Sequence, residues 1–563
     1  MTNLRSYSIL IFAVFAVFAR TASFSFIGLD DAGYTFRNPF VATGISWANI
    51  IESFANFTNG GIWMPFTYIS YMADIEVSGF SGIHLASWMH SVNVLIHMLN
   101  AVLLLYFAKQ LSAALRLNPS FRLLLAAVVF WAIHPLRAEP VSWIACRKEL
   151  LWVFFALSGL IFWVRSFNKA TGPFAAKACQ SLTVMLFAAA CLCKPTAMCL
   201  PVLAAVVHRL LHVFSGQNKE PSKSSRFVAA SYVLMFLFAG ATGVAAAYSQ
   251  THVAGQEAVA LFAAPLHHRI VHALSALGFY VRSFFLPIGL HIDCRMTEGV
   301  LPLGGVLNLI VFALAFAGLC HKAIGIKIWK CSPAAAACVF CIAWFIVPLA
   351  PTLGLFGSFG IEAHADRFTY LPMMAVVFCA MFIPVQGAPN GDCFSGGKKR
   401  ILLWMAVAVF SVAAYRQTGF WKDDHIAHRR ALECDSEHPR AMVHVADAFC
   451  ARMRNFDKGI ELYRKSIALR PKEYVNYRLA YALASRGNRE DYQEVKRLGA
   501  AVIGDPSLDK RGMMLDALGT AYMAEGDWES AIRFFEASIA APGRFWPKAS
   551  TKHKLDQCLE RIK

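Results

Sequence analysis

The chain has 563 residues, of which 57% are hydrophobic and only 16% are charged. Its mean hydropathy is +0.48, which excludes a soluble protein with a fully wetted surface, because lipid must cover much of this apolar area. The formal net charge of +18 does not indicate nucleic-acid binding, because the Lys and Arg residues lie between apolar runs, where retention of positive loops on the cytoplasmic side explains them.

A membrane helix needs about 20 mostly apolar residues. Such runs begin near residues 7, 86, 122, 149, 177, 196, 227, 302, 333, 368 and 400, which predicts about eleven spans. The first run lacks a small-residue cleavage site, so we expect a retained helix. Two further stretches, 62–75 and 268–287, carry many aromatic residues or the basic Arg269 and Arg282. We expect interfacial or re-entrant helices there, because a lipid-facing Arg at mid-depth costs about 3 kcal/mol.

Basic residues cluster on alternate loops. With the N-terminus inside, every inner loop is basic, as the positive-inside rule requires. Treating 268–287 as a span would put the last two clusters outside, so we expect it not to span. An odd number of spans then places residues 420–563 outside the cytoplasm. The inner clusters are Lys109, Arg116 and Arg122; Arg165, Lys169 and Lys177; Arg209, Lys219, Lys223 and Arg226; Lys322, Lys327 and Lys330; and Lys398, Lys399 and Arg400.

The charge-rich tail has the spacing of tetratricopeptide (TPR) repeats, in which small and large residues let two helices interlock. The best-matched unit lies over 513–542. A second unit over 438–471 has Gly459 where the small residue of the second helix is usually Ala, and the stretch 474–500 is a degenerate copy of the repeat. We predict an all-α protein, with a transmembrane bundle over 1–419 and a short TPR superhelix over 420–563. The best-matched unit, 513–542, holds Leu518, Gly519, Tyr522, Gly526, Ala531, Phe535 and Pro542.

An acidic pair, Asp30 and Asp31, lies just past the first predicted span. Adjacent carboxylates repel each other, so one can hold a raised pKa and act as a base, or both can share a cation. The alternative is a solvated helix cap or turn.

Several outer loops carry cations, against the inside-positive bias. They predict a counter-charge for an anion such as a lipid-linked phosphate. The alternative is that they snorkel to head groups or pair with Glu139 and Glu149. The cations are Arg137, Arg147, Lys148, Lys194 and Arg367.

Three histidines, His84, His90 and His97, lie before and within the second predicted span. The last two share a helix face, but no Cys or carboxylate completes a ligand set, so we predict no metal site there. The sequence has no phosphate-binding glycine loop, nucleophile elbow or dinucleotide fingerprint.

In order and spacing, the motifs resemble those of the bacterial relatives of the TMTC-type protein O-mannosyltransferases, which are GT-C glycosyltransferases. The chain departs from that family at Met64, where His or Arg is frequent, and at Ala32-Gly33, where a third acidic residue is frequent. The resemblance is carried by Asp30-Asp31 with Tyr34 and Asn38-Pro39, Trp63 to Thr67, His84-Leu85 with His97 and Asn100, His134-Pro135 to Glu149, Lys194-Pro195, Ala365 to Pro372, and Tyr415-Arg416 with Trp421.

The resemblance implies a membrane enzyme that moves a sugar, with inversion, from a polyprenyl-phosphate carrier to an extracytoplasmic protein hydroxyl. Its base would be Asp30 or Asp31, and the five outer cations would bind the donor phosphate. A divalent cation could bridge Asp30 and the phosphate but is not required. The acceptor side or cavity would be lined by Tyr34, Trp63, His84, His134, Glu139 and Asp366.

The same resemblance implies a place in a bacterial inner membrane, with the active site and the TPR domain on the periplasmic side. The expected partners are the lipid-linked sugar, a protein acceptor held by the TPR domain, and membrane lipids, with no nucleic acid. Two alternatives are a non-catalytic TPR scaffold for envelope assembly and a transporter or flippase for a lipid-linked sugar, although the broken, repeated helices typical of such transporters are not evident.

Overall fold

The computed structural model describes residues 2–57, 61–168, 170–215, 225–253, 265–292, 304–307, 310, 333–355, 364–383, 397–500, 511–541 and 548–563. Within these ranges the chain is helical and contains no strand, which confirms the predicted all-α class. It divides into two compact units, Met1–Asp424 and His425–Lys563. The predicted domain boundary was 419/420.

Seven helices in the described ranges are long and apolar enough to cross a membrane, and a bent pair of helices would make an eighth. The chain is therefore an integral membrane protein, and these eight segments match eight of the eleven predicted runs. The seven are Arg5–Ser23, Leu85–Ala114, Ile144–Ser166, Pro173–Cys193, Pro195–Ser215, Arg226–Gln250 and Pro333–Thr352, and the bent pair is Phe121–Ala132 with Pro135–Ser142.

Several of these segments combine an α-helix with short 3-10 turns. The elements are α1 (Thr2–Phe18) with η1 (Ala19–Ser23), α5 (Leu85–Ala114), α6 (Phe121–Ala132) with η3 (Pro135–Arg137) and α7 (Ala138–Ser142), η4 (Ile144–Cys146) with α8 (Arg147–Ser166), α9 (Pro173–Cys193), η5 (Pro195–Cys199) with α10 (Leu200–Ser215), α11 (Ser225–Val253), and α15 (Pro333–Ile346) with η7 (Ala350–Thr352).

The remaining three predicted runs differ from a simple span. The run near 302 lies mostly outside the described residues. The run near 368 begins as two 3-10 turns, η8 (Asp366–Thr369) and η9 (Pro372–Met374), before α16 (Ala375–Phe382), because Pro372 lacks the N–H that a continuous helix needs. The run near 400 forms α17 (Gly397–Gly419), which exposes Trp404 and Val409.

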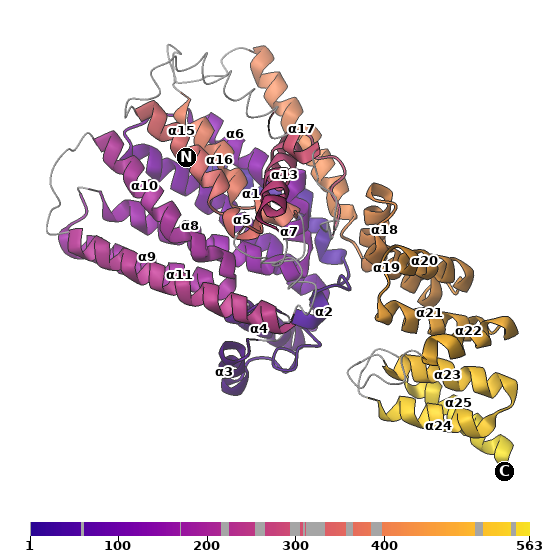
Figure 1. The fold of residues 1–563 in the computed structure, drawn as a ribbon. Helices are drawn as coiled ribbons and strands as arrows, with labels where there is room; N and C mark the ends of the chain where they lie inside the picture. Colours follow the sequence, from indigo (N-terminus) through magenta and orange to yellow (C-terminus); the bar gives the residue numbers. More distant parts are fainter. Residues whose placement is uncertain are drawn as a thin grey trace. The chain divides into compact units, whose positions relative to one another are not determined.

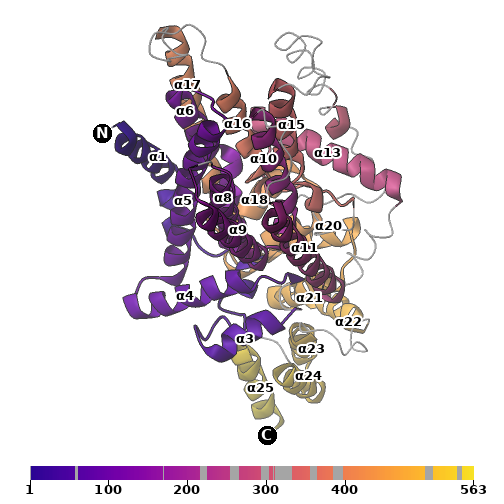
Figure 2. The ribbon, with the colours of Figure 1, turned by 90° about the vertical axis from the view of Figure 1, so that its left-hand side faces the viewer.

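Two helices occupy the stretches expected not to span. These are α4 (Pro65–Ser81) and α13 (Leu266–Phe285), and neither is among the helices suited to cross a membrane. Figure 2 shows α4 lying across the direction of α5. Before it, α2 (Asp31–Tyr34) and α3 (Trp47–Ala55) follow the first span, and Ser46 caps α3 by accepting a hydrogen bond from Asn49 N at 3.1 Å.

A buried polar network fixes the 366–370 segment to the spanning helices, among which α9 packs against both α8 and α11 (Figure 1). His97 Nε2 lies 2.9 Å from Ala132 O, so this nitrogen must donate, and Nδ1 then accepts from Tyr370 Oη at 2.6 Å. Asn100 Nδ2 donates to the same Oη at 3.2 Å. The network therefore holds in place the turn that carries Asp366 and Arg367.

In the second unit, consecutive helices pack against one another, and the first helices of two successive pairs begin 34 residues apart, at Pro439 and Glu473. This spacing is the length of a TPR unit. The helices are α18 (Asp424–Cys434), α19 (Pro439–Ala451), α20 (Phe456–Leu469), α21 (Glu473–Arg486), α22 (Arg489–Ala500), α23 (Arg511–Glu525), α24 (Trp528–Ala540) and α25 (Lys548–Ile562).

Small residues let these helices pack closely. A Cβ on Gly519 would lie 2.6 Å from the buried Phe535 ring, and one on Gly459 would collide with Cys450 Sγ. Cys450 thus fills the space that an Ala at position 459 would need. These contacts fit the interlock expected of TPR helices, and the TPR assignment itself stays a prediction.

Candidate active site

The acidic pair consists of one buried and one accessible carboxylate. Asp31 is fully buried, and its two oxygens accept backbone hydrogen bonds from Ile27 N at 2.7 Å and Ala145 N at 2.8 Å. Burial is the main cause that raises the pKa of Asp31 to about 7, and the charge of Asp30 adds to it, whereas the two N–H donors and Lys148 oppose it. Asp31 therefore ties the loop after the first span to the turn before α8, and its full burial keeps it out of contact with a substrate.

Asp30 is the accessible member of the pair. Its side chain is 40% exposed, and its Oδ2 lies 4.0 Å from Lys148 Nζ. Asp30 stands at the N-cap position of α2, yet its side chain makes no capping hydrogen bond, which argues against the helix-cap alternative. The ammonium of Lys148 also lies 4.5 Å from the centroid of the Tyr34 ring. Asp30 and Lys148 thus form a loose pair beside a buried tyrosine.

Three other cations of the predicted site each have a carboxylate of their own. The pairs are Arg147 with Asp74, Lys194 with Glu149, and Arg367 with Glu139, and every side chain in them is at most 10% exposed. The expected surplus of positive charge around the acidic pair is therefore largely balanced within the fold, because buried charges need partners.

Arg147 uses its donors entirely within the protein. Its Nε donates to Asn93 Oδ1 at 2.8 Å, its Nη2 donates to Met89 O at 2.9 Å, and its Nη1 pairs with Asp74. Its guanidinium carbon also lies 4.8 Å from the centroid of Tyr71. Arg147 thus joins α4, α5 and α8, and its fully buried guanidinium offers no accessible surface to a phosphate.

Lys194 and Glu149 form a second internal pair, at the end of α9 and the start of α8. Glu149 also accepts a hydrogen bond from Trp152 Nε1 at 2.8 Å, and Lys194 Nζ lies 5.0 Å from the Phe368 ring centroid. Burial lowers the pKa of Lys194, and Glu149 opposes this shift. The pair holds two spanning helices to the 366–370 segment.

Arg367 and Glu139 form the third pair, at the start of η8. Glu139 Oε2 accepts from Arg367 N at 2.8 Å, and its Oε1 pairs with the guanidinium. The same guanidinium lies 5.3 Å from the Trp143 ring centroid. Glu139 is thus both the counter-ion of Arg367 and the acceptor for the first turn of η8, which makes it a positioning group.

Arg137 is buried without a carboxylate in direct contact among the described residues. Both of its terminal nitrogens donate to Thr369 O at 3.3 Å. Its Nε is buried and has no hydrogen-bond partner among the described residues. Asp366 lies nearby, and burial and the charge of Glu139 raise its pKa well above its ordinary value, against the influence of Arg137 and Arg367. These two predicted site residues therefore lie together, beneath the Glu139–Arg367 pair.

The predicted cavity-lining residues have different surroundings. Tyr34 is buried beside Lys148, whereas His84 is exposed at the start of α5. Trp63 stacks on Phe57 at 5.4 Å between centroids. His134 is a structural residue: its Nδ1 accepts from Leu136 N at 3.2 Å, so its Nε2 donates to Phe284 O at 2.9 Å.

Sequence reasoning missed Asp74 and Asn93, which neutralise and orient Arg147. A signal for Asp74 exists, because a buried Arg near a membrane needs a carboxylate, and Asp74 is the only acidic residue in 62–75. It also missed Tyr68, which is buried and packs edge-on against Tyr34 at 6.2 Å.

No protein-family model matches the chain, and no curated protein matches it. Among solved structures it is similar to the crystal structure of ArnT from Cupriavidus metallidurans bound to undecaprenyl phosphate. The two share 13% sequence identity over 98% of this chain and 84% of that one, with a TM-score of 0.37.

Proposed function

We propose that the chain is a GT-C-type membrane glycosyltransferase that moves a sugar from a polyprenyl-phosphate carrier onto an acceptor hydroxyl. The observation that carries the proposal is the pairing of an accessible carboxylate, Asp30, with an almost buried ammonium, Lys148, 4.0 Å away. Asp30 lies in the loop after the first span and Lys148 in the first turn of α8, at the end of the membrane unit that we propose faces outward. The motif resemblance in the sequence points to the same chemistry.

In this proposal Asp30 is the general base. The acceptor oxygen attacks the anomeric carbon while its proton passes to Asp30, and the bond from that carbon to the phosphate oxygen breaks. The polyprenyl phosphate leaves with the bonding electrons, and Lys148 neutralises its charge. The anomeric configuration inverts, because one displacement occurs. Asp31 acts only as a positioning residue, because it is fully buried and its two oxygens accept backbone N–H groups.

The roles of the other cations follow from their partners. Arg367 and Lys194 are 10% and 8% exposed at the side chain, so they remain candidates for contact with the donor phosphate once it enters. Arg147 and Arg137 are assigned to the support of the site. No divalent cation is needed, since Lys148 supplies the counter-charge, and we expect a chelator such as EDTA to leave transfer unchanged.

We further propose that residues 420–563 lie outside the cytoplasm, on the same side as Asp30, and that their helical repeats hold a protein acceptor. The basic loops and the odd number of spans in the sequence support this sidedness. Alkaline phosphatase and a cytoplasm-only fluorescent reporter, each fused after Lys563, decide it. A fluorescent C-terminal fusion would contradict the proposed topology.

The decisive experiment compares Asp30→Asn, Asp31→Asn and Lys148→Gln. Purified proteins are incubated with radiolabelled polyprenyl-phosphate sugars, and both donor hydrolysis and transfer are measured. Asp30→Asn should stay folded and lower transfer by about a hundredfold or more, since the amide keeps the shape but cannot accept the proton. Lys148→Gln should weaken use of the donor.

The matched control is Glu52→Gln, which removes another carboxylate, on α3, whose described hydrogen bond is only to Asn56. It should transfer sugar at the wild-type rate. If Asp30→Asn is as active as this control, Asp30 is not the base. If no donor in the panel is hydrolysed or transferred by the wild type, a scaffold role becomes the better explanation.

A further inference from the structure

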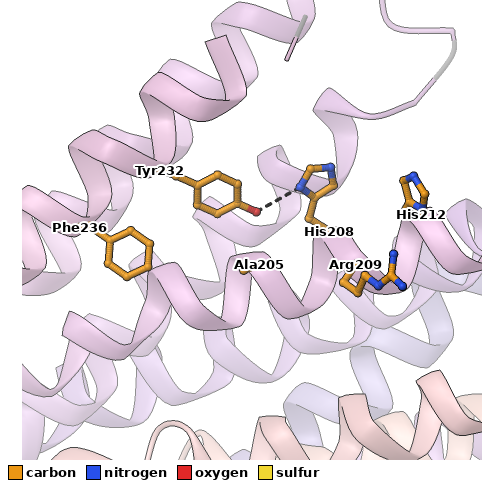
Figure 3. A pocket seen from close by; sticks show the side chains of 6 residues that line it. All are labelled: Ala205, His208, Arg209, His212, Tyr232 and Phe236. Carbon is orange, nitrogen blue, oxygen red and sulfur yellow. Dashed lines mark hydrogen bonds between the residues drawn. The ribbon is translucent and has the colours of Figure 1, made fainter. Parts of the chain in front are cut away.

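A pocket of about 380 Å³ opens between α10 and α11, away from the candidate active site. Lys194 precedes α10, whereas Arg209 lies nine residues beyond the first residue of this helix, which corresponds to about 14 Å along its axis. The pocket therefore lies toward the membrane face opposite Lys194. It is lined by Ala205, His208, Arg209, His212, Tyr232 and Phe236 (Figure 3).

Arg209, the cation of this pocket, lies on the surface of the protein that faces lipid. Ala205, Arg209 and His212 are exposed and lie on one face of α10, at positions i, i+4 and i+7. This helix belongs to a segment suited to span the membrane. A lipid-facing Arg is costly there unless it reaches an anionic group, and none of the six lining residues is acidic.

Aromatic stacking gives the pocket a fixed wall. The His208 ring stacks on Phe167, with centroids 4.4 Å apart and ring planes at 19°. Its Nδ1 lies 3.2 Å from Tyr232 Oη, and this hydrogen bond links α10 to α11 (Figure 3). In the same view, Arg209 and His212 lie side by side at one end of the pocket and Phe236 lies at the other. The pocket thus has a basic end and an apolar end.

The surface next to the apolar end suits a hydrocarbon chain. On α11, Val233, Phe236 and Leu237 are 58%, 53% and 63% exposed. We propose that the pocket binds an anionic glycerophospholipid of the leaflet opposite the active site. Arg209 and His212 hold its phosphate head group, and an acyl chain lies along Phe236 and the exposed residues of α11.

The test uses the full-length chain in detergent, with lipid binding measured by native mass spectrometry and by thermal protection. The probes are phosphatidylglycerol, phosphatidylcholine and inorganic phosphate. The wild type should bind phosphatidylglycerol about tenfold more tightly than phosphatidylcholine, and inorganic phosphate alone should not protect it. Arg209→Gln should lose this preference, while Arg209→Lys should keep most of it because the positive charge remains.

The matched control is Arg165→Gln, which removes an exposed cation from the last turn of α8 and leaves the pocket intact. It should keep the preference for phosphatidylglycerol. The proposal is overturned if the wild type binds the two lipids equally well. It is also overturned if Arg209→Gln and Arg165→Gln lose the preference for phosphatidylglycerol to the same extent, or if inorganic phosphate protects the wild type as well as phosphatidylglycerol does. Donor hydrolysis by Arg209→Gln should match the wild type, so lipid binding is scored separately from the proposed enzyme activity.

Discussion

Trp421 stacks on Trp143, with ring centroids 5.6 Å apart and ring planes at 27°. Trp143 in turn lies beneath the guanidinium of Arg367, and Trp421 follows α17 in the chain. The residue after Trp421 is also anchored: the Lys422 carbonyl accepts a hydrogen bond from Ser25 N at 2.9 Å. The end of the last helix of the membrane unit is therefore part of the support beneath the candidate active site.

This stacking predicts an effect of shortening Trp421, which is only 2% exposed. Trp421→Ala should destabilise the protein by about 3–5 kcal/mol, because it removes a large buried ring. Trp421→Phe should cost much less and keep donor hydrolysis, because an aromatic ring still supports Trp143. Thermal unfolding in detergent and donor hydrolysis check this. Equal losses in both variants would show that the stacking does not matter.

The raised pKa of Asp31 predicts how stability depends on pH. Asp31 has a pKa of about 7 in the folded protein against 3.8 in the unfolded chain, so the folded state binds more protons between these values. The free energy of unfolding should therefore fall as pH rises from about 4 to about 7. Asp31→Asn should remove this fall in the free energy of unfolding between about pH 4 and pH 7, and Asp30→Asn should retain it. Parallel pH profiles for wild type and Asp31→Asn would contradict the prediction.

The buried pair of Lys194 and Glu149 predicts strong coupling. Either Lys194→Met or Glu149→Gln alone leaves one buried charge unpaired and should cost about 3–5 kcal/mol. The double variant should recover a large part of this loss, because no unpaired charge remains. A double-mutant cycle from chemical unfolding measures the coupling. Additive losses would mean that the two side chains do not interact in the folded protein.

The contact between Gly519 and Phe535 predicts a steric effect in the repeat unit. A methyl group on Gly519 would lie 2.6 Å from the ring, so Gly519→Ala should destabilise α23 and α24 by about 1–3 kcal/mol. Adding Phe535→Leu should relieve part of the clash. Hydrogen exchange of these helices in the full chain detects both effects. Unchanged protection in Gly519→Ala would show that α24 lies farther from α23 than described.

The sequence predicted the spanning helices well because each one is a long apolar run, a signal that needs no knowledge of neighbours. It also separated α4 and α13 from the spans, since aromatic or basic residues interrupt them. It did not predict the 3-10 turns at Asp366–Thr369, because their geometry depends on Glu139, which lies 228 residues earlier in the chain and accepts from Arg367 N.

The site was predicted less completely for the same reason. The sequence drew attention to the cations of the predicted site, but the partner of each depends on which distant helices meet. Lys194 and Glu149 are 45 residues apart, and Arg147 and Asp74 are 73 residues apart. The sequence also left Asp30 and Asp31 equivalent. The difference between them arises from two backbone N–H groups that only the folded loop brings to Asp31.

The bend between α6 and α7 affects when this part of the membrane unit can finish folding. Backbone groups freed by a break in a helix find no water within hydrocarbon, and here the ring of His134 accepts from Leu136 N and donates to Phe284 O. Phe284 is synthesised 150 residues after His134, which takes roughly 8–30 s at typical rates of translation. Until α13 emerges, the second hydrogen bond of His134 cannot form. We expect the bend to be completed only when α13 docks, as a late step of assembly in the membrane.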